Sequence, residues 1–361
     1  MNRDLCKKIP PKSIKVFGSG GSNTIIVITP DHKVYKYFIT FSKIDSNTPK
    51  KYKETIQFYK NEINVQKYLT KHIVKTNLSP HIVQLQHTLE CKNSPSFFFK
   101  KCPSYQSFIL TKNKKPIPTD CKYMLLGHPV ILKKGFLIAE LEYCPITLGQ
   151  IIEQSICKSN QHLEKTLNRI LFQILFTLAT IQKKFPYFVH HDLFMRNVLA
   201  TELKASKNEY IRYTFGKYTF DLPANGFMCK ISDFGLSDLN QKIHSSPLVV
   251  KSPYEDIFNI LYDIYNGGNL GAQSLLSIAK QKKNKRKIQF IHTYFSRFIN
   301  TKIIRTIEKK GKKNLLNWNW RQFYNIQMSK LLHVKCPSTY LKYFTKIYPT
   351  KKEHTIIQYY G

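Results

Sequence analysis

Hydrophobic and polar positions repeat with two different periods along the first third of the chain. Residues 24–29 are β-branched and apolar, as in a buried strand, and residues 33–39 alternate in a way that predicts a second strand. Pro30-Asp31-His32 between them is a turn signal. After a polar connection over residues 41–53, apolar side chains recur near helical spacing over residues 54–69. The pattern predicts strands followed by a helix.

The remaining two thirds change from irregular to helical. Residues 91–135 are rich in Lys, Pro and Ser and predict an insertion, after which residues 136–143 predict another strand. Residues 164–183 carry a wide apolar stripe, which predicts a buried helix. From Asp256 onward the pattern is helical. Strands that come mostly first and helices that come mostly later indicate the α+β class.

Composition limits the class of protein. The chain has 361 residues and 42% hydrophobic residues, enough for a large core, so wholesale disorder is excluded. Its formal charge of +35 predicts attraction to polyanions or acidic proteins. The eight cysteines form no C-x-x-C pair and match no zinc module, so we expect reduced thiols. The N-terminus lacks secretory features and no apolar stretch reaches the ~20 residues of a membrane span.

Two polar clusters carry the candidate chemistry. The first is His190-x-Asp192-x-x-x-x-Asn197, and the second is Asp233-Phe234-Gly235. Phosphoryl transfer needs a phosphate cradle, a cation, oxygen ligands for Mg²⁺ and a carboxylate that orients the attacking hydroxyl. An Asp and an Asn five apart on one loop can supply the carboxylate and a ligand together. A second Asp after a strand can supply another ligand.

These clusters resemble the signature of the protein-kinase superfamily, and the resemblance covers most of the chain. It implies a single kinase domain over residues 1–361 with two lobes. A small β-rich lobe would span residues 1–139 with the insertion 91–135, and a larger helical lobe residues 140–361. The implied cofactors are ATP and Mg²⁺. The implied roles are catalytic for Asp192, metal-binding for Asn197 and Asp233, and structural for His190, Phe234 and Gly235.

The N-terminal third resembles the kinase nucleotide site. Residues 18–23 resemble the glycine-rich loop that covers the phosphates in kinases. The run has Asn23 where the family has a third glycine, and Asn tolerates the positive φ that such loops use. Lys36 resembles the lysine that holds the α- and β-phosphates, and Glu62 resembles its helical partner. The strand over residues 136–143 resembles the one that leads to the hinge between lobes. The implied ATP-binding residues are Gly18, Ser19, Gly20, Gly21, Ile25, Val34, Lys36, Glu140 and Glu142.

Two positions near the catalytic Asp bear on regulation. Asp256 resembles the buried Asp that braces the catalytic loop, a structural role. His191 replaces the usual Arg that anchors a phosphate on the activation segment. A neutral imidazole is a poor phosphate anchor, and the segment from Asp233 to Asp256 is short. We therefore expect activity without phosphorylation of that segment.

An expanded hairpin between Asn197 and Asp233 indicates a particular group within the kinase superfamily. It contains a Leu-Pro-x-x-Gly-aromatic run that ends at Phe227, and no Ala-Pro-Glu follows. These features resemble the divergent serine/threonine kinases of large cytoplasmic DNA viruses, with the haspin-like kinases as the nearest cellular comparison. Arg196 occurs at the corresponding place in many tyrosine kinases, so tyrosine or dual specificity stays open.

Other functions remain open at this point. A catalytically silent scaffold would bind through its kinase-like shape alone. A small-molecule phosphotransferase would share the catalytic loop. The basic runs at residues 280–287 and 309–313 read as solvated faces or as a surface for nucleic acid. We expect a protein substrate that is acidic or already phosphorylated, because the positive charge of the enzyme attracts anions. A viral protein of this kind would act in the host cytoplasm or the virion, and a cellular one in the cytoplasm or nucleus.

Overall fold

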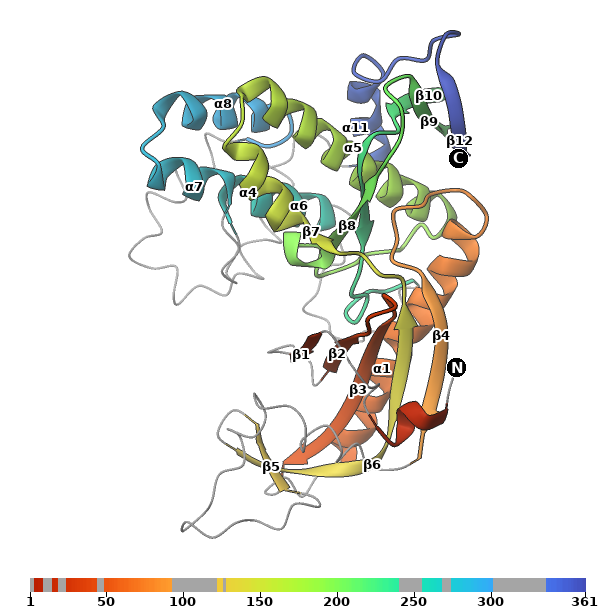
Figure 1. Ribbon diagram of the computed structural model, residues 1–361. Coiled ribbons are helices and arrows are strands. Elements are labelled where there is room, and N and C mark those ends of the chain that lie inside the picture. The colour runs from red at the N-terminus through yellow and green to blue at the C-terminus, as the bar shows by residue number, and fades with distance from the viewer. Residues whose placement is uncertain are drawn as a thin grey trace. The chain divides into compact units, whose positions relative to one another are not determined.

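The computed structural model describes residues 3–8, 15–18, 24–43, 49–92, 122–125, 128–239, 255–267, 274–300 and 336–361 (Figure 1). The chain divides into two compact units. Unit 1 comprises Met1–Lys67 and Gln84–Tyr143, and unit 2 comprises Tyr68–Val83 and Cys144–Gly361. Each unit is described below by itself.

Unit 1 is an antiparallel sheet with one long helix. The sheet has the strand order β1-β2-β3-β6-β4, and β5 pairs with the far end of β6. The elements are the 3₁₀ helix η1 (Arg3–Cys6), β1 (Lys15–Gly18), β2 (Thr24–Ile28), β3 (Val34–Lys43), α1 (Pro49–Leu69), β4 (Leu85–Cys91), β5 (Lys122–Leu125) and β6 (His128–Leu141).

The helix α1 packs against one face of this sheet. Tyr59 of α1 is buried in a cluster with Phe38 of β3, Leu85 of β4 and Ala139 of β6. The rings of Phe38 and Tyr59 lie 5.2 Å apart, within the range of favourable aromatic pairs. This contact orients the helix on the central strands β3 and β6, so α1 and β3 can present side chains to each other.

Several predicted boundaries in unit 1 are wrong. The strand β3 runs on to Lys43 and α1 begins at Pro49, so most of the polar connection predicted over residues 41–53 is regular structure. The strand predicted over residues 136–143 begins at His128, inside the predicted irregular insertion. Pairing with β3 and β5 extends the strand through Pro129 and Gly135, which local propensity does not favour. Residues 93–121 of the insertion lie outside the described residues.

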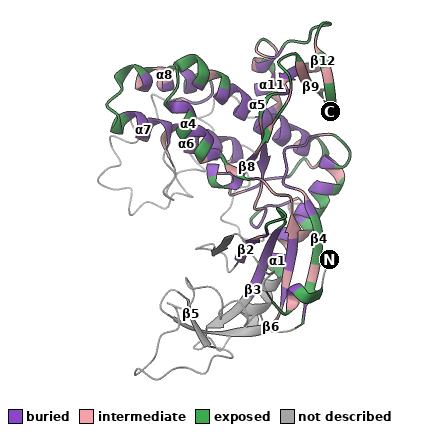
Figure 2. Cartoon of the chain, viewed as in Figure 1, coloured by how far each residue is buried: buried purple, intermediate pink, exposed green. Residues whose placement is uncertain are grey.

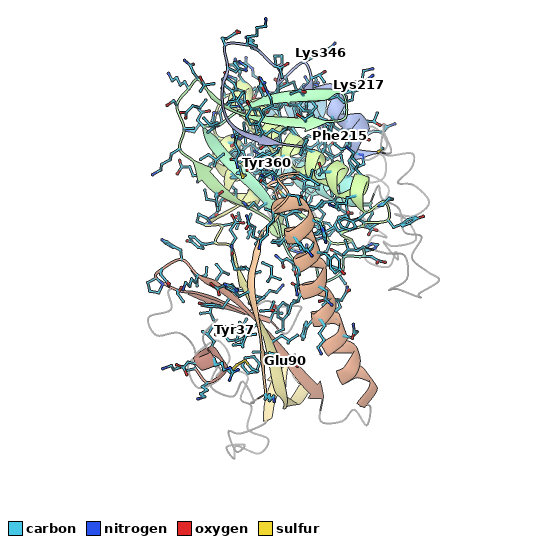
Figure 3. The ribbon with its side chains drawn as sticks, turned by 90° about the vertical axis from the view of Figure 1, so that its right-hand side faces the viewer. Tyr37, Glu90, Phe215, Lys217, Lys346 and Tyr360 are labelled. Atoms are coloured by element: carbon cyan, nitrogen blue, oxygen red, sulfur yellow. A yellow bond between two sulfur atoms is a disulfide. The ribbon has the colours of Figure 1, made fainter. Side chains whose placement is uncertain are left out.

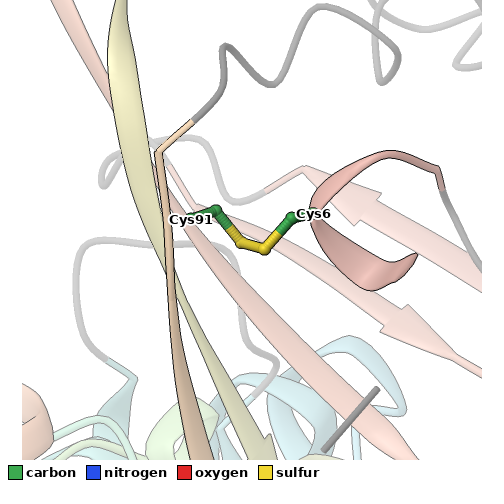
Figure 4. Close-up of a disulfide and its surroundings, with 2 residues drawn as sticks. All are labelled: Cys6 and Cys91. Carbon is green, nitrogen blue, oxygen red and sulfur yellow. A yellow bond between two sulfur atoms is a disulfide. The ribbon is translucent and has the colours of Figure 1, made fainter. Parts of the chain in front are cut away.

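A disulfide corrects the expectation of reduced thiols. Cys6 of η1 is bonded to Cys91 at the end of β4, 85 positions further along the chain, and their Cα atoms lie 5.4 Å apart (Figure 4). The bond fastens the N-terminal 3₁₀ helix to the sheet. Sequence spacing shows no such pairing, because only the fold brings residues this far apart together.

Unit 2 combines helices with two small sheets. Its first residues include the π-helix η2 (Thr70–Val74). The strands are β7 (Ile146–Thr147), β8 (Val198–Leu203), β9 (Glu209–Phe215), β10 (Tyr218–Pro223), β11 (Gly226–Ile231) and β12 (Thr355–Tyr360). The helices are α4 (Leu148–Ile156), α5 (Asn160–Lys184), α6 (Glu255–Asn266), α7 (Leu275–Gln281), α8 (Lys285–Phe295) and α11 (Pro337–Phe344). The sheets have the orders β10-β9-β12 and β11-β8-β7.

The core of unit 2 is built around α5. Its residues are buried almost continuously from Thr166 to Ile181 (Figure 2), in agreement with the predicted buried helix. The ring of Phe172 lies at the centre of an aromatic cluster from α5, the β9–β10 hairpin, α11 and the segment after it. Its ring centroid is 5.1 to 5.5 Å from those of Tyr213, Phe220, Phe344 and Tyr348. The expanded hairpin is therefore an integral part of the core.

The Leu-Pro-x-x-Gly-aromatic run forms the turn between β10 and β11. The buried guanidinium of Arg169 donates to the carbonyl oxygens of Pro223, Asn225 and Phe227 at 2.7 to 2.8 Å. Gly226 has φ +115°, and a Cβ there would lie 3.2 Å from the guanidinium. Glycine is needed here both for the backbone conformation and for the close approach of Arg169.

The C-terminus ends in a strand that the helical pattern did not predict. The strand β12 pairs in parallel with β9. Upstream of it, the buried carboxylate of Asp221 accepts hydrogen bonds from Arg212 Nε at 2.7 Å, from His354 Nδ1 at 3.0 Å and from the Lys351 backbone N–H at 3.3 Å. Burial raises the pKa of Asp221, but these hydrogen bonds and the charge of Arg212 outweigh it, so the pKa lies below its usual value.

Asp221→Asn is expected to destabilise the protein by about 1–3 kcal/mol at neutral pH. Because the folded-state pKa is lowered, the carboxylate stabilises above its unfolded pKa of about 4 and loses that contribution as the pH falls through the folded value. The free energy of unfolding of the variant, measured with denaturant at several pH values, should therefore fall less steeply towards low pH than that of the wild type. It should also show faster amide exchange over residues 351–360. Glu353→Gln, which removes an exposed partner of Lys351, is the control; equal effects of the two variants would contradict the prediction.

The basic run at residues 280–287 is only partly solvated. Lys287 is buried, and its ammonium group donates to the carbonyl oxygen of Lys158 at 2.8 Å. The run at residues 309–313 lies outside the described residues. Among the helices that the structure describes, none is long and apolar enough to span a membrane.

Candidate functional site

The cluster that begins at His190 lies on a loop of unit 2 between α5 and β8, which includes the 3₁₀ helix η4 (Met195–Asn197). The amide nitrogen of the Asn197 side chain donates to the backbone oxygen and to Oδ2 of Asp192, each at 2.8 Å. Arg196 donates to Oδ1 of Asp192 at 2.5 Å. The carboxylate is therefore held at both oxygens by residues four and five positions further along the chain.

Two carboxylates of α6 accept hydrogen bonds from the backbone of this loop. Asp256 is fully buried and accepts from the N–H groups of His190 at 2.7 Å and His191 at 3.0 Å. Asp263 accepts from the N–H of Met195 at 2.7 Å. The two acids are seven residues apart and so lie on one face of the helix. A single helix thus holds the loop on both sides of Asp192.

The ring of His190 connects the loop to the second cluster. Its Nδ1 accepts from the N–H of Asp192, so Nε2 carries the proton and donates to the carbonyl oxygen of Ser232 at 3.1 Å. Burial lowers the pKa of His190 to about 4, which keeps the ring neutral. The ring also packs on buried Phe234, with centroids 5.0 Å apart. These contacts make His190 and Phe234 structural supports of the loop.

Ser232 links the loop that carries Asn197 to the segment that carries Asp233. The N–H and the hydroxyl of Ser232 both donate to the carbonyl oxygen of Asn197, at 2.9 and 3.0 Å. Asp233 follows with φ 66°, a conformation that few non-glycine residues adopt. The charge of Asp233 also raises the pKa of Asp192, so the two carboxylates lie within electrostatic reach.

Asn197 and Asp233 fit a magnesium site by their chemistry. Both hydrogen bonds of the Asn197 side chain to Asp192 use its nitrogen, and neither uses its oxygen. An amide oxygen and a carboxylate are hard donors, and Mg²⁺ is commonly held by one or two protein groups, with water and substrate phosphates completing the shell. Among the described residues, no group of three or more His, Cys, Asp or Glu side chains could hold a metal.

The carboxylates of the site have shifted pKa values. Burial raises the pKa of Asp192, although Arg196 and Asn197 favour its ionised form. Burial raises the pKa of Asp256 to about 7, although its two backbone donors act in the opposite direction. Clustered shifts of this kind are typical of functional sites.

His191 is paired with a carboxylate. Its Nδ1 lies 3.0 Å from Oε2 of Glu255, the first residue of α6. Burial lowers the pKa of His191, but the hydrogen bond and charge of Glu255, with Asp256 and Asp238, outweigh burial and raise it. The sequence argument used the ordinary pKa of a histidine ring, and the contact with Glu255 raises the pKa above that value. Activity without phosphorylation of the segment from Asp233 to Asp256 stays a prediction. Its reason is now that the ring of His191 already pairs with Glu255 and is not available to a phosphate.

Unit 1 contains a buried ion pair. Lys36 of β3 and Glu62 of α1 meet with Nζ and Oε1 2.5 Å apart, and their side chains are 8% and 3% exposed. Lys33, three residues away, instead pairs with exposed Asp31. The strand β3 lies between β2 and β6, so the ion pair of Lys36 and Glu62 lies against the middle of the sheet.

The other nucleotide-site candidates of unit 1 are placed in part. Ile25 and Val34 are buried on β2 and β3. Glu140 lies in β6, and the N–H of Glu142 donates to the carbonyl oxygen of Gln84 at 2.9 Å. Gly18 ends β1, while Ser19, Gly20 and Gly21 lie outside the described residues. In unit 2, Gly235 is buried next to Phe234.

Sequence reasoning missed two residues that hold the loop, Asp263 and Glu255. The signal for Asp263 was its spacing of seven from Asp256, which places both acids on one helix face. No local pattern indicates that Glu255 meets His191, because the two residues are 64 positions apart in the sequence.

The chain is similar in sequence to proteins that carry the name of serine/threonine-protein kinases. No protein-family model matches the chain. A protein of Acanthamoeba polyphaga mimivirus named "Putative serine/threonine-protein kinase" is 31% identical over 334 residues, 84% of this chain and 82% of that protein. A Dictyostelium discoideum protein named "Probable serine/threonine-protein kinase" is 34% identical over 113 residues, 30% of this chain and 9% of that protein. One of the same name from Invertebrate iridescent virus 6 is 34% identical over 83 residues, 23% of this chain and 16% of that protein.

Proposed function

Because this chain belongs to the family of viral serine/threonine-protein kinases, we propose that it transfers the γ-phosphoryl group of ATP to Ser or Thr of protein substrates with Mg²⁺. The proposal includes a two-lobed kinase domain, with the lobes corresponding broadly to unit 1 and unit 2. From the viral relatives we also propose action in the host cytoplasm or the virion.

One observation carries the proposal. In unit 2, Asn197 donates to Asp192 through its side chain and accepts through its carbonyl oxygen from Ser232, the residue before Asp233. A carboxylate beside two hard oxygen donors is what phosphoryl transfer to a hydroxyl requires. The supporting bonds from Asp256 and Asp263 restrict this loop to one backbone conformation, which favours catalysis by positioning.

Each residue then has a distinct role. Asp192 orients the substrate hydroxyl and accepts its proton during transfer. Lys36, oriented by Glu62, binds phosphate oxygens of the nucleotide. Asn197 and Asp233 hold Mg²⁺, which when bound neutralises negative charge on the phosphates. Arg196 keeps one oxygen of Asp192 occupied until a substrate competes for it.

The alternatives have less support. A silent scaffold has no need of the buried Lys36–Glu62 pair or of the arranged Asp192. Arg196 at the position seen in tyrosine kinases contacts Asp192 directly, and this keeps tyrosine or dual specificity as the second candidate. The charge of +35 favours acidic protein substrates over basic ones.

Transfer from radiolabelled ATP to an acidic and a basic test protein, followed by phosphoamino-acid analysis, tests the function. We expect Mg²⁺-dependent labelling, mainly of the acidic protein, as phosphoserine and phosphothreonine. A chelator should abolish it, because the phosphates would then lack their counter-ion. Phosphotyrosine alone would contradict the proposed specificity, and labelling unchanged by the chelator would contradict the role of Asn197 and Asp233.

A further inference from the structure

A hollow in unit 2 takes no part in the chemistry proposed above. Its volume is about 1250 Å³, and its walls come from α4, α5, the β9–β10 hairpin and the segment between α11 and β12. Every lining residue belongs to unit 2, and none lies on the loop 190–197 or the segment 232–235.

The walls of this hollow are held in place before any ligand arrives. Arg169 fixes the turn before β11 through its three carbonyl partners. Asp221 fastens the C-terminal segment to the hairpin through Arg212, Lys351 and His354. A hollow with preformed walls loses little conformational entropy on binding, so weak polar contacts suffice to give measurable affinity.

Exposed lysines from three segments surround the hollow. They are Lys158 after α4, Lys165 on α5, and Lys346 and Lys351 between α11 and β12; Lys346 is labelled in Figure 3. Lys351 lies 4.0 Å from Glu353, and the other three ammonium groups have no hydrogen bond or ion pair with any described residue.

Acidic residues of the lining do not balance this charge. The carboxylate of Asp221 is buried and already neutralised by Arg212. Glu202 is the other acid of the lining, and it is exposed. The hollow therefore has a surplus of positive charge directed at whatever enters it.

The shape and chemistry of the hollow favour an extended ligand. Basic residues are frequent throughout this protein, so positive charge alone does not mark a site; its combination with a hollow does. The volume exceeds the ~300–1,000 Å³ of usual small-molecule pockets. The ammonium groups belong to separate segments, which suits several spaced carboxylates better than one compact anion. Exposed Gln154 of α4 can bond a peptide backbone, and so can the amide nitrogen of Gln150, whose oxygen accepts from Thr147.

A nucleic acid fits the lining less well. Binding of single strands relies on aromatic faces and arginines. One face of Tyr210 is covered by His354, whose ring centroid is 3.7 Å away. Arg169, the one arginine of the lining, uses its donors on carbonyl oxygens.

We propose that this hollow binds an acidic segment of a protein partner, whose carboxylates pair with Lys158, Lys165 and Lys346. The site is separate from the loop 190–197, and binding to it does not depend on phosphoryl transfer. Binding is therefore measured on the full chain without nucleotide, so that failure of this proposal and failure of the proposed kinase activity are distinguishable.

The test uses fluorescence anisotropy with a labelled peptide rich in Glu and Asp. Its counterpart with Gln and Asn, and a labelled single-stranded oligonucleotide, are the comparison ligands. We expect saturable binding of the acidic peptide that weakens as NaCl increases, because exposed ion pairs are screened. Amide exchange should show protection over residues 157–165 and 345–351. Absence of this protection, or equal binding of the uncharged peptide, would overturn the proposal.

A charge-matched control separates the site from the overall charge. Lys158→Glu/Lys165→Glu/Lys346→Glu should weaken peptide binding by about tenfold or more, since three attractions become repulsions. Lys280→Glu/Lys283→Glu/Lys285→Glu changes exposed lysines outside the lining by the same charge and should have an effect of about twofold or less. Glutamine versions of the first set should weaken binding to a lesser degree, which guards against misfolding of the reversal variant. Equal loss in both sets, or tighter oligonucleotide binding that the first set abolishes, would overturn the proposal.

Discussion

Asp192→Asn is expected to lower the turnover of phosphoryl transfer by about 10³-fold and to leave nucleotide affinity nearly unchanged. The carboxamide is not a base, so the substrate hydroxyl loses its proton acceptor. In asparagine an NH₂ group replaces one carboxylate oxygen, so it would face either Arg196 or Asn197, both of which donate to Asp192. The bonds from Asp256 and Asp263 to the loop backbone remain, so the fold should persist.

Single-turnover kinetics and nucleotide calorimetry on the same preparations measure this prediction. Arg196→Gln is the matched control, because it removes the ion pair to Asp192 but keeps the carboxylate. We expect that control to change turnover by about tenfold at most. If Asp192→Asn retained near wild-type turnover, Asp192 would not be the catalytic carboxylate.

Lys36→Met is expected to destabilise the protein by about 3–5 kcal/mol and to abolish transfer. The methionine fills the volume of the lysine stem, but the buried carboxylate of Glu62 then loses the ammonium group of Lys36. The main cost is the desolvation of this carboxylate, which the ion pair no longer offsets, and it weakens the packing of α1 against β3. Denaturant unfolding and amide exchange resolved over β3 and α1 measure the loss.

A second variant distinguishes stability from chemistry. Lys36→Met/Glu62→Leu removes both charges and should recover most of the lost stability, because an apolar pair of similar volume replaces a buried ion pair without penalty. It should not recover transfer, since no cation remains for the phosphates. Lys33→Met breaks the exposed pair with Asp31 and should change stability by about 1 kcal/mol at most. A loss no larger in Lys36→Met than in Lys33→Met, or transfer by the double variant, would contradict the assignment.

Local patterns in the sequence predict the elements and clusters that depend on neighbours along the chain. The apolar stripe of α5 is confirmed as a buried helix, because a stripe that wide leaves no face for water. The order of strands before helices predicts the α+β class, which the structure shares. The family is likewise evident from residues 190–197 and 233–235, because a catalytic loop keeps its functional groups within a few residues of each other.

Strand ends were less predictable than helices. The part of β6 before Phe136 has the apolar residues 130–132 between residues that do not favour a strand, such as Pro129 and Gly135, and pairing with β3 and β5 stabilises it. The strand β12 similarly depends on β9, more than 140 residues earlier, so a helical reading of the C-terminal region missed it. Hydrogen bonds between distant strands leave no periodic trace in either partner.

By itself, therefore, the sequence determined the class of fold and the family, and it predicts the site residues of the loop 190–197, since each of these depends on short-range spacing. Only the tertiary structure decided which distant groups meet: Cys6 with Cys91, Glu255 with His191, and the lysines around the hollow of unit 2. Such pairings join residues that are far apart in the sequence. They depend on how whole helices and strands pack, and no short stretch of residues encodes that packing.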